Sequence, residues 1–176
     1  MLEAGILHDG DPLELIDGIL VHKDRGGDGM TYGRRHARVV SLLTDCKPRI
    51  EALGCYLRVQ QPIELTATSA PEPDISIVEG NARSYTRRNP GPADVLAVIE
   101  VADSSLAFDR GPKLRLYASA GIRSYVIVDI PGARIEVHQD PDPARGCYVR
   151  RNDAGPAETH FSPSIRYRSD SLRITL

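Results

Sequence analysis

The sequence VLAVIEV at residues 95–101 decides the fold of this chain, because it is an apolar run that carries a carboxylate, Glu100, near its end. A second short run, PDISIV at residues 73–78, carries Asp74 near its start. Short runs rich in Val and Ile are typical of β-strands. We therefore expect two strands that deliver both carboxylates to one place.

Lys113 follows these two runs closely and completes a set of residues with a definite chemistry. Two carboxylates on adjacent strands can hold a hard divalent cation. A lysine within reach of that cation could orient an attacking water or help to deprotonate it. The three residues together indicate metal-assisted hydrolysis of a phosphodiester.

Each of these residues also has an ordinary structural interpretation. An aspartate after proline is more often a turn or cap residue than a metal ligand, and a lone lysine such as Lys113 is usually a solvated helix residue. Glu100 is harder to explain in this way, because a carboxylate at the end of an apolar strand is costly to bury unpaired. Its alternative role is a salt bridge to Lys113 or Arg115. Tyr117 lies one helical turn from Lys113, so both are candidates for the same cleft.

Length and composition limit the function classes. A chain of 176 residues fits a single domain, residues 1–176, and its 26% charged residues and formal charge of −2 argue against coating nucleic acid by net charge alone. No apolar stretch approaches the roughly 18 residues of a membrane span, and no signal peptide is evident, so we expect a cytoplasmic protein without a membrane partner. The three cysteines form no Cys-x-x-Cys pair and signal neither a disulfide framework nor a zinc site.

Hydrophobic periodicity and turn residues predict an α/β order of elements. In the first half we expect a hairpin over 13–21 with its turn at Asp17-Gly18. A helix over 35–53 should follow, interrupted near Pro48 and ended by Gly54. Strands over 55–65 and 71–78 and a loop over 79–92 come next. In the second half we expect Asp109 to cap a helix with body Lys113–Ala120. A strand over 124–130, a turn at Pro131-Gly132 and a strand over 134–138 should follow as a hairpin. A polar loop over 140–146 and edge strands complete the chain.

Several ordered motifs match a known family: LELIDG at 13–18, His36, PEPD at 71–74, VIEVADSSL at 98–106, Asp109-Arg110, Lys113, Tyr117-Ala118 and AGI at 120–122. They strongly resemble the Uma-two family of restriction endonucleases, which is assigned to the PD-(D/E)XK nuclease superfamily. The resemblance covers nearly the whole chain and fades after about Arg150. It implies a restriction-endonuclease-like α/β fold with a central mixed sheet flanked by helices, Mg²⁺ as cofactor with Mn²⁺ as a substitute, and DNA as substrate.

The resemblance also implies roles for individual residues. Asp74 matches the metal-binding aspartate and Glu100 the acidic residue of the next strand, and the carbonyl of Val101 would be the adjacent ligand. The superfamily lysine would stand two residues after Glu100, where this chain has Ala102, and Lys113 fills its role from the following helix. Glu14 matches a glutamate that binds a second metal or orients the water.

Substrate contacts are expected from Gln60, His36, Arg87, Arg88 and Tyr117. His36 is a candidate base or substrate contact, and Gln60 a polar contact on the strand before Asp74. Arg87 and Arg88 lie in a loop that could contact phosphates, although an arginine-rich loop is usually only solvated. The resemblance further suggests a homodimer that presents two sites.

Three functions from different classes remain open at this stage. The first is a metal-dependent DNA endonuclease, the second a nucleic-acid-binding or regulatory module with little turnover, and the third a structural dimerisation protein. For the first, replacing Lys113 by alanine should abolish cleavage while leaving stability nearly intact.

Overall fold

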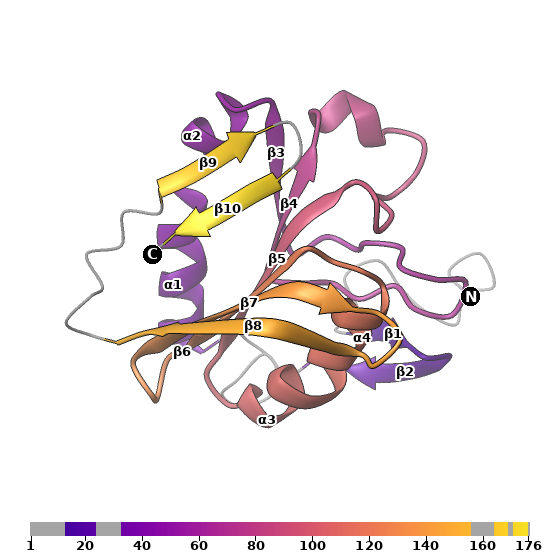
Figure 1. Ribbon diagram of the computed structural model, residues 1–176, viewed down its shortest axis with the longest axis vertical. Helices are drawn as coiled ribbons and strands as arrows, with labels where there is room; N and C mark the ends of the chain where they lie inside the picture. Colours follow the sequence, from indigo (N-terminus) through magenta and orange to yellow (C-terminus); the bar gives the residue numbers. More distant parts are fainter. Residues whose placement is uncertain (1–12, 24–32, 156–163, 169–170, 176) are drawn as a thin grey trace.

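A mixed six-stranded sheet in the order β3-β4-β5-β6-β7-β8 forms the centre of the computed structural model (Figure 1). The structure describes residues 13–23, 33–155, 164–168 and 171–175. The strands of this sheet are β3 Cys55–Val59, β4 Ile75–Glu79, β5 Val95–Ala102, β6 Ser124–Asp129, β7 Arg134–Asp142 and β8 Cys147–Ala154. Two separate hairpins pair β1 Leu13–Ile16 with β2 Ile19–His22, and β9 Ser164–Arg168 with β10 Ser171–Thr175.

Neighbouring strands of the sheet are antiparallel except for β5 and β6, which are parallel. A parallel pair needs a crossover connection, and here it consists of α3 Leu106–Phe108, a π-helical turn over Asp109–Lys113 and α4 Leu114–Ser119. This crossover brings Lys113 back over the sheet, within reach of Glu100 on β5.

Helices cover both faces of the sheet, and each face has its own apolar core. On one face, α1 Arg34–Thr44 and α2 Lys47–Glu51 contribute Val40, Leu43 and Ile50 to a cluster with Ile75 of β4. On the other face, Tyr117 of α4 packs in the cluster that also includes side chains of β1 and β5. Strand β5 is therefore buried from both sides, which explains why it is an almost continuous apolar run.

The N-terminal hairpin is fixed by its turn and by one neighbouring loop. Asp17 and Gly18 both have positive φ, +49° and +80°, as a two-residue hairpin turn requires. Gly18 donates its N–H to the carbonyl of Thr68 at 2.8 Å, and Leu15 forms an isolated bridge with Ala70. These contacts hold β1, and Glu14 on it, beside the segment that leads into β4.

The expected fold is confirmed: a mixed sheet flanked by helices in one α/β domain. The helix expected over 35–53 is indeed broken before Pro48, which occupies the first turn of α2, and Gly54 follows with φ of +76°. The strands expected over 55–65 and 71–78 are shorter, and Asp74 lies one residue before β4 rather than within a strand. That the domain extends over all of residues 1–176 stays a prediction.

Two expectations for the second half are wrong. Asp109 does not cap a helix, because the helical segment already begins at Leu106 and Asp109 has helical backbone angles within it. Pro112 lacks an N–H, and the chain accommodates it in a π-helical turn instead of starting a helix there. The polar loop expected over 140–146 is also shorter, since β7 continues to Asp142. In the described part of the chain, no helix is both long and apolar enough to cross a membrane.

Candidate active site

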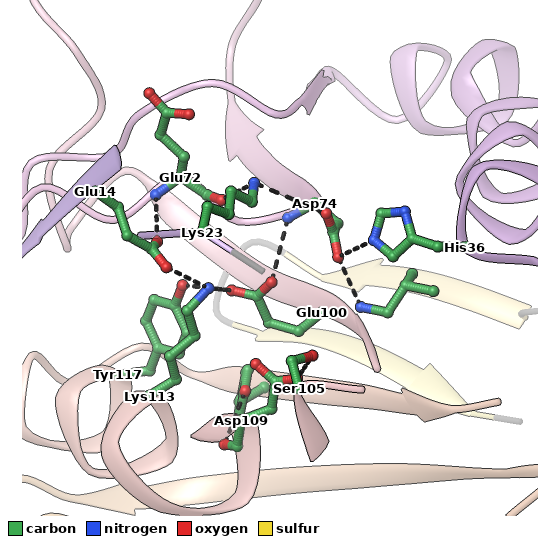
Figure 2. A network of polar contacts seen from close by, with 12 residues as sticks. Glu14, Lys23, His36, Glu72, Asp74, Glu100, Ser105, Asp109, Lys113 and Tyr117 are labelled. Atoms are coloured by element: carbon green, nitrogen blue, oxygen red, sulfur yellow. Dashed lines mark hydrogen bonds and ion pairs between the residues drawn. The ribbon is translucent and has the colours of Figure 1, made fainter. Parts of the chain in front are cut away.

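The start of β4, the end of β5, the N-terminal hairpin and the π-helical turn meet at a cleft of about 270 Å³ (Figure 2). Its lining includes Glu14, Lys23, His36, Asp74, Glu100, Asp109 and Lys113. All seven side chains are buried. A group of ionisable side chains in a small, poorly solvated space is typical of a functional site.

Asp74 is held at one oxygen and left open at the other. Its Oδ2 lies 3.0 Å from His36 Nε2 and accepts a hydrogen bond from the backbone N–H of Val101 at 2.9 Å. Its Oδ1 is buried and has no hydrogen-bond partner among the described residues, although Lys23 Nζ lies 3.8 Å away. Burial acts to raise the pKa of Asp74, but the hydrogen bond from His36 and the charge of Lys23 outweigh it and lower the pKa.

Glu100 and Lys113 form a buried ion pair beside Asp74. Lys113 Nζ donates to Glu100 Oε1 at 2.9 Å, and the hydroxyl of Tyr117 donates to the same oxygen at 2.8 Å. The other oxygen, Oε2, accepts from the backbone N–H of Asp74 at 3.4 Å. The carboxylates of Asp74 and Glu100 therefore line the same cleft.

Burial and the neighbouring charges shift the pKa values of both Glu100 and Lys113. Burial raises the pKa of Glu100 to about 8, since Lys113 opposes the effect only in part while Asp74, Asp109 and Glu14 add to it. Burial alone would lower the pKa of Lys113, but Glu100 and Glu14 raise it above its ordinary value. Lys113 therefore keeps its proton, and a role as a base is disfavoured.

Glu14 connects the N-terminal hairpin to this pair. Its Oε1 lies 3.1 Å from Lys113 Nζ, and its Oε2 accepts from the backbone N–H of Glu72 at 3.1 Å. Lys113 thus contacts carboxylates from β1 and β5 at once. The sequence places Glu14 and Lys113 almost a hundred positions apart, and only the resemblance pointed to Glu14.

The π-helical turn carries Asp109 on its cleft side, where burial raises the pKa of this carboxyl. Ser105 donates its hydroxyl to Asp109 Oδ2 at 2.6 Å, and Tyr125 donates to the backbone carbonyl of Asp109 at 3.0 Å. The sequence reasoning took Asp109 as a cap and missed its place in the cleft. The Asp109-Arg110 motif was the available signal.

Arg110 fastens the same turn to the sheet on its other side. Its Nε donates to Glu136 Oε1 at 2.9 Å, and its Nη2 contacts both Glu136 and Asp129, the latter at 3.1 Å. Glu136 and Asp129 lie on β7 and β6 and are 0% and 2% exposed. The turn that carries Asp109 and Lys113 is therefore tied to two strands through one guanidinium.

Two groups of predicted residues lie elsewhere. Gln60 reaches Asp74 only through its backbone N–H, which donates to the Asp74 carbonyl at 3.0 Å, and its side chain does not line the cleft. Arg87 and Arg88 lie before the start of β5, whereas Glu100 is near its end, and Arg88 forms a two-point ion pair with Asp94 at 2.6 and 2.9 Å. A role for these three residues in substrate binding stays a prediction.

A divalent cation needs oxygen donors, and the cleft offers those of Asp74 and Glu100. Within residues 13–23 and 33–155, no group of three or more His, Cys, Asp or Glu side chains is arranged to hold a metal ion. Mg²⁺ does not require three protein side chains as ligands, because it keeps several waters and is usually held by one or two carboxylates. The buried and open Oδ1 of Asp74, together with Glu100 beside it, fits such a cation.

The fold is that of a nuclease-like α/β protein. The sequence profile of the Uma2 family, described as "Putative restriction endonuclease", matches residues 2–166, and the chain belongs to this family. Among solved structures, the chain is similar to one described as a "putative nuclease belonging to DUF820" from Anabaena variabilis, with 13% identity and a TM-score of 0.61 over 98% of this chain and 92% of the other. At that identity the likeness shows the fold. A search of curated proteins finds no match.

Proposed function

We propose that this protein is a metal-dependent endonuclease that hydrolyses phosphodiester bonds of DNA. The observation that carries the proposal is the convergence of Asp74, Glu100 and Lys113 in one buried cleft, with Lys113 Nζ 2.9 Å from Glu100 Oε1 and the Asp74 N–H 3.4 Å from Glu100 Oε2. Membership of a family described as "Putative restriction endonuclease" supports the reaction class.

Asp74, Glu100 and the carbonyl of Val101 are the groups that would hold Mg²⁺, or Mn²⁺ in its place. When bound there, the cation would stabilise the charge that develops on the phosphate and lower the pKa of a water molecule. His36 and the Val101 N–H fix one oxygen of Asp74, so the other oxygen points in a defined direction. Tyr117 fixes Glu100 in the same way.

Lys113 supplies positive charge rather than a proton acceptor. Its raised pKa keeps the ammonium charged, and Glu14 and Glu100 hold it from two sides. A charged donor fixed before the reaction stabilises a phosphorane-like transition state without reorganisation. Glu14 thus acts by orienting Lys113.

The test is cleavage of supercoiled plasmid DNA by the purified protein with Mg²⁺ or Mn²⁺. The wild type should nick or linearise the plasmid, and Asp74→Asn and Glu100→Gln should each remove the activity and the binding of Mn²⁺ measured by calorimetry. Asp153→Asn is the matched control, because Asp153 is an exposed carboxylate that pairs with Arg151. Cleavage that persists in both site variants would contradict the proposal.

A second function is favoured by one specific observation. Except for Asp74 Oδ1, the oxygens of Asp74, Glu100 and Glu14 already have partners within the protein. A site satisfied in this way suits a module that binds nucleic acid but turns over slowly. DNA binding by the wild type without cleavage under any divalent cation would favour this alternative.

We also propose that the protein acts as a homodimer. The strand β8 is at one edge of the sheet, where no other described strand pairs with it, and the apolar side chain of Val149 on β8 is 74% exposed. Light scattering should give the mass of two chains, and Val149→Lys should shift it to that of one. A single-chain mass for the wild type at high concentration would remove the dimer.

A further inference from the structure

Lys23 is a second buried lysine in the cleft, and no part of the sequence reasoning assigned it a role. It directly follows β2 and is 5% exposed. Its Nζ donates to the backbone carbonyl of Glu72 and lies 3.8 Å from Asp74 Oδ1. Lysine is almost never buried to this extent unless it is paired, so the position needs an explanation.

The distribution of lysine over the chain makes the position more informative. Of the 22 lysine and arginine residues, only Lys23, Lys47 and Lys113 are lysines. Lys47 is on α2 and has a 43% exposed side chain, whereas Lys23 and Lys113 both line the cleft. The chain therefore uses arginine almost everywhere for positive charge and keeps lysine, a compact point charge with three donors, for the site.

Lys23 faces a buried carboxylate oxygen, Asp74 Oδ1, that accepts no hydrogen bond from the described residues. Asp74 Oδ2 accepts from two groups, while Oδ1 is buried without a hydrogen bond. A separation of 3.8 Å is close enough for an ion pair but too long for a hydrogen bond. Lys23 thus balances the charge of Oδ1 without occupying its lone pairs.

Charge balance in the cleft gives this arrangement a function. With its carboxylates and lysines ionised and its histidines neutral, the lining carries a formal charge of −2, from Glu14, Asp74, Glu100 and Asp109 against the two lysines. One divalent cation neutralises this charge. With a cation at Asp74, the Lys23 ammonium would lose its counter-ion and would have a like charge beside it, so an entering phosphate would be its best partner.

We propose that Lys23 is the counter-ion of Asp74 while no divalent cation is bound, and a phosphate-binding residue once the cation has taken Asp74 Oδ1. The proposal rests on the proposed function, since it concerns the same cation and the same phosphodiester. It assigns separate tasks to the two lysines. Lys113 is fixed by two carboxylates, whereas Lys23 exchanges its partner during binding.

The test compares Mn²⁺ affinity by calorimetry in three variants. Lys23→Met removes the ammonium charge that competes with the cation at Asp74, and the methionine side chain has a similar length. Mn²⁺ should therefore bind about three- to tenfold more tightly to this variant than to the wild type. Lys23→Arg keeps the charge and should bind Mn²⁺ as the wild type does. Lys47→Met removes a distant lysine and should change nothing. An unchanged or weaker affinity in folded Lys23→Met overturns the proposal, because a purely structural lysine would give that result.

A second measurement needs no variant. Acylation of the wild-type lysines, followed by mass spectrometry, should show Lys23 becoming more reactive when Mn²⁺ is added and protected again by a phosphorothioate DNA duplex, with Lys47 as internal reference. Reactivity of Lys23 that does not respond to Mn²⁺ overturns the proposal. Tighter Mn²⁺ binding by Lys23→Met in a protein that never cleaves DNA would contradict the nuclease function and leave the counter-ion role standing. Cleavage of DNA by the wild type, together with unchanged Mn²⁺ affinity in Lys23→Met, would support the nuclease function and overturn the counter-ion role.

Discussion

Lys113 Nζ donates to Glu100 Oε1 at 2.9 Å, and both side chains are only 4% exposed. This pair joins the crossover to strand β5 within the cleft. Because the pair is buried, removal of Lys113 should affect stability as well as activity. Loss of one member of a buried pair leaves an uncompensated charge in the protein interior, which costs much more than loss of a surface ion pair.

We therefore expect Lys113→Ala to abolish cleavage and also to lower the free energy of unfolding, by about 3–5 kcal/mol. The sequence-based expectation was nearly unchanged stability, but it took no account of how deeply Lys113 and Glu100 are buried. Urea denaturation measures the stability change. Lys47→Ala is the control, because its pair with Glu51 has 43% and 48% exposed side chains and should be worth at most about 0.5 kcal/mol. Equal stability of the two variants would contradict the buried pair.

Arg110→Ala should destabilise the protein and impair cleavage together. Glu136 would keep Arg151 at 3.2 Å, but the link between the π-helical turn and β7 would be lost. Because Arg110 is one-third exposed, we expect a loss of about 2–4 kcal/mol, somewhat below that for a fully buried pair. Arg150→Ala is the matched control: Arg150 and its partner Asp140 are 43% and 60% exposed, and the change should stay within about 0.5 kcal/mol.

His138 should make stability depend on pH. Burial lowers the pKa of His138, and the neighbouring Glu136 offsets this only in part, with Arg151 and Asp153 also close. The unfolded chain, with an ordinary histidine pKa of 6.5, accepts a proton that the folded protein resists. The unfolding free energy should therefore fall as the pH decreases from about 7 to 5.

His138→Gln should flatten this dependence in urea titrations at several pH values. Tyr148→Phe serves as its control, since the Tyr148 ring lies 6.0 Å from that of His138 and packs in the same region. The control should lose stability equally at every pH and keep the wild-type slope. An unchanged slope in His138→Gln would assign the dependence to other groups.

The parts of the structure whose conformation depends on adjacent residues could be predicted from the sequence. The Asp17-Gly18 turn, the break before Pro48 and the apolar strand β5 each follow from a few adjacent residues. The alternation of apolar runs also placed Asp74 and Glu100 near one another. Residues of this kind are predictable because their conformation is decided within a short window.

The rest of the site depends on contacts between distant residues. Lys23 and Glu72 are 49 residues apart, and Arg110 and Glu136 are 26 apart, so no local pattern connects them. Glu136 follows the apolar–polar alternation expected of a half-exposed strand, yet Arg110 and Arg151 cover it completely. Tertiary packing alone decides such positions, and sequence periodicity cannot identify them.

Two sets of arginines differ in how they are placed to contact DNA. Arg34, Arg35 and Arg38 are exposed on α1, the helix that brings His36 to Asp74, and have no ion pair with any described residue. Arg87 and Arg88 are also exposed, but Asp94 already neutralises Arg88, and both lie away from the carboxylates. We therefore expect the α1 arginines to make the larger electrostatic contribution to DNA binding.

The measurement is the salt dependence of binding to a duplex in the presence of EDTA, which prevents cleavage. Each phosphate contact contributes about −0.9 to the slope of log affinity against log salt. Replacing Arg34, Arg35 and Arg38 together by glutamine should reduce the slope by up to about 2.7, and replacing Arg87 and Arg88 together should reduce it by at most about 0.9. A larger effect of the Arg87 and Arg88 pair would place the DNA backbone on the loop before β5 instead of on α1.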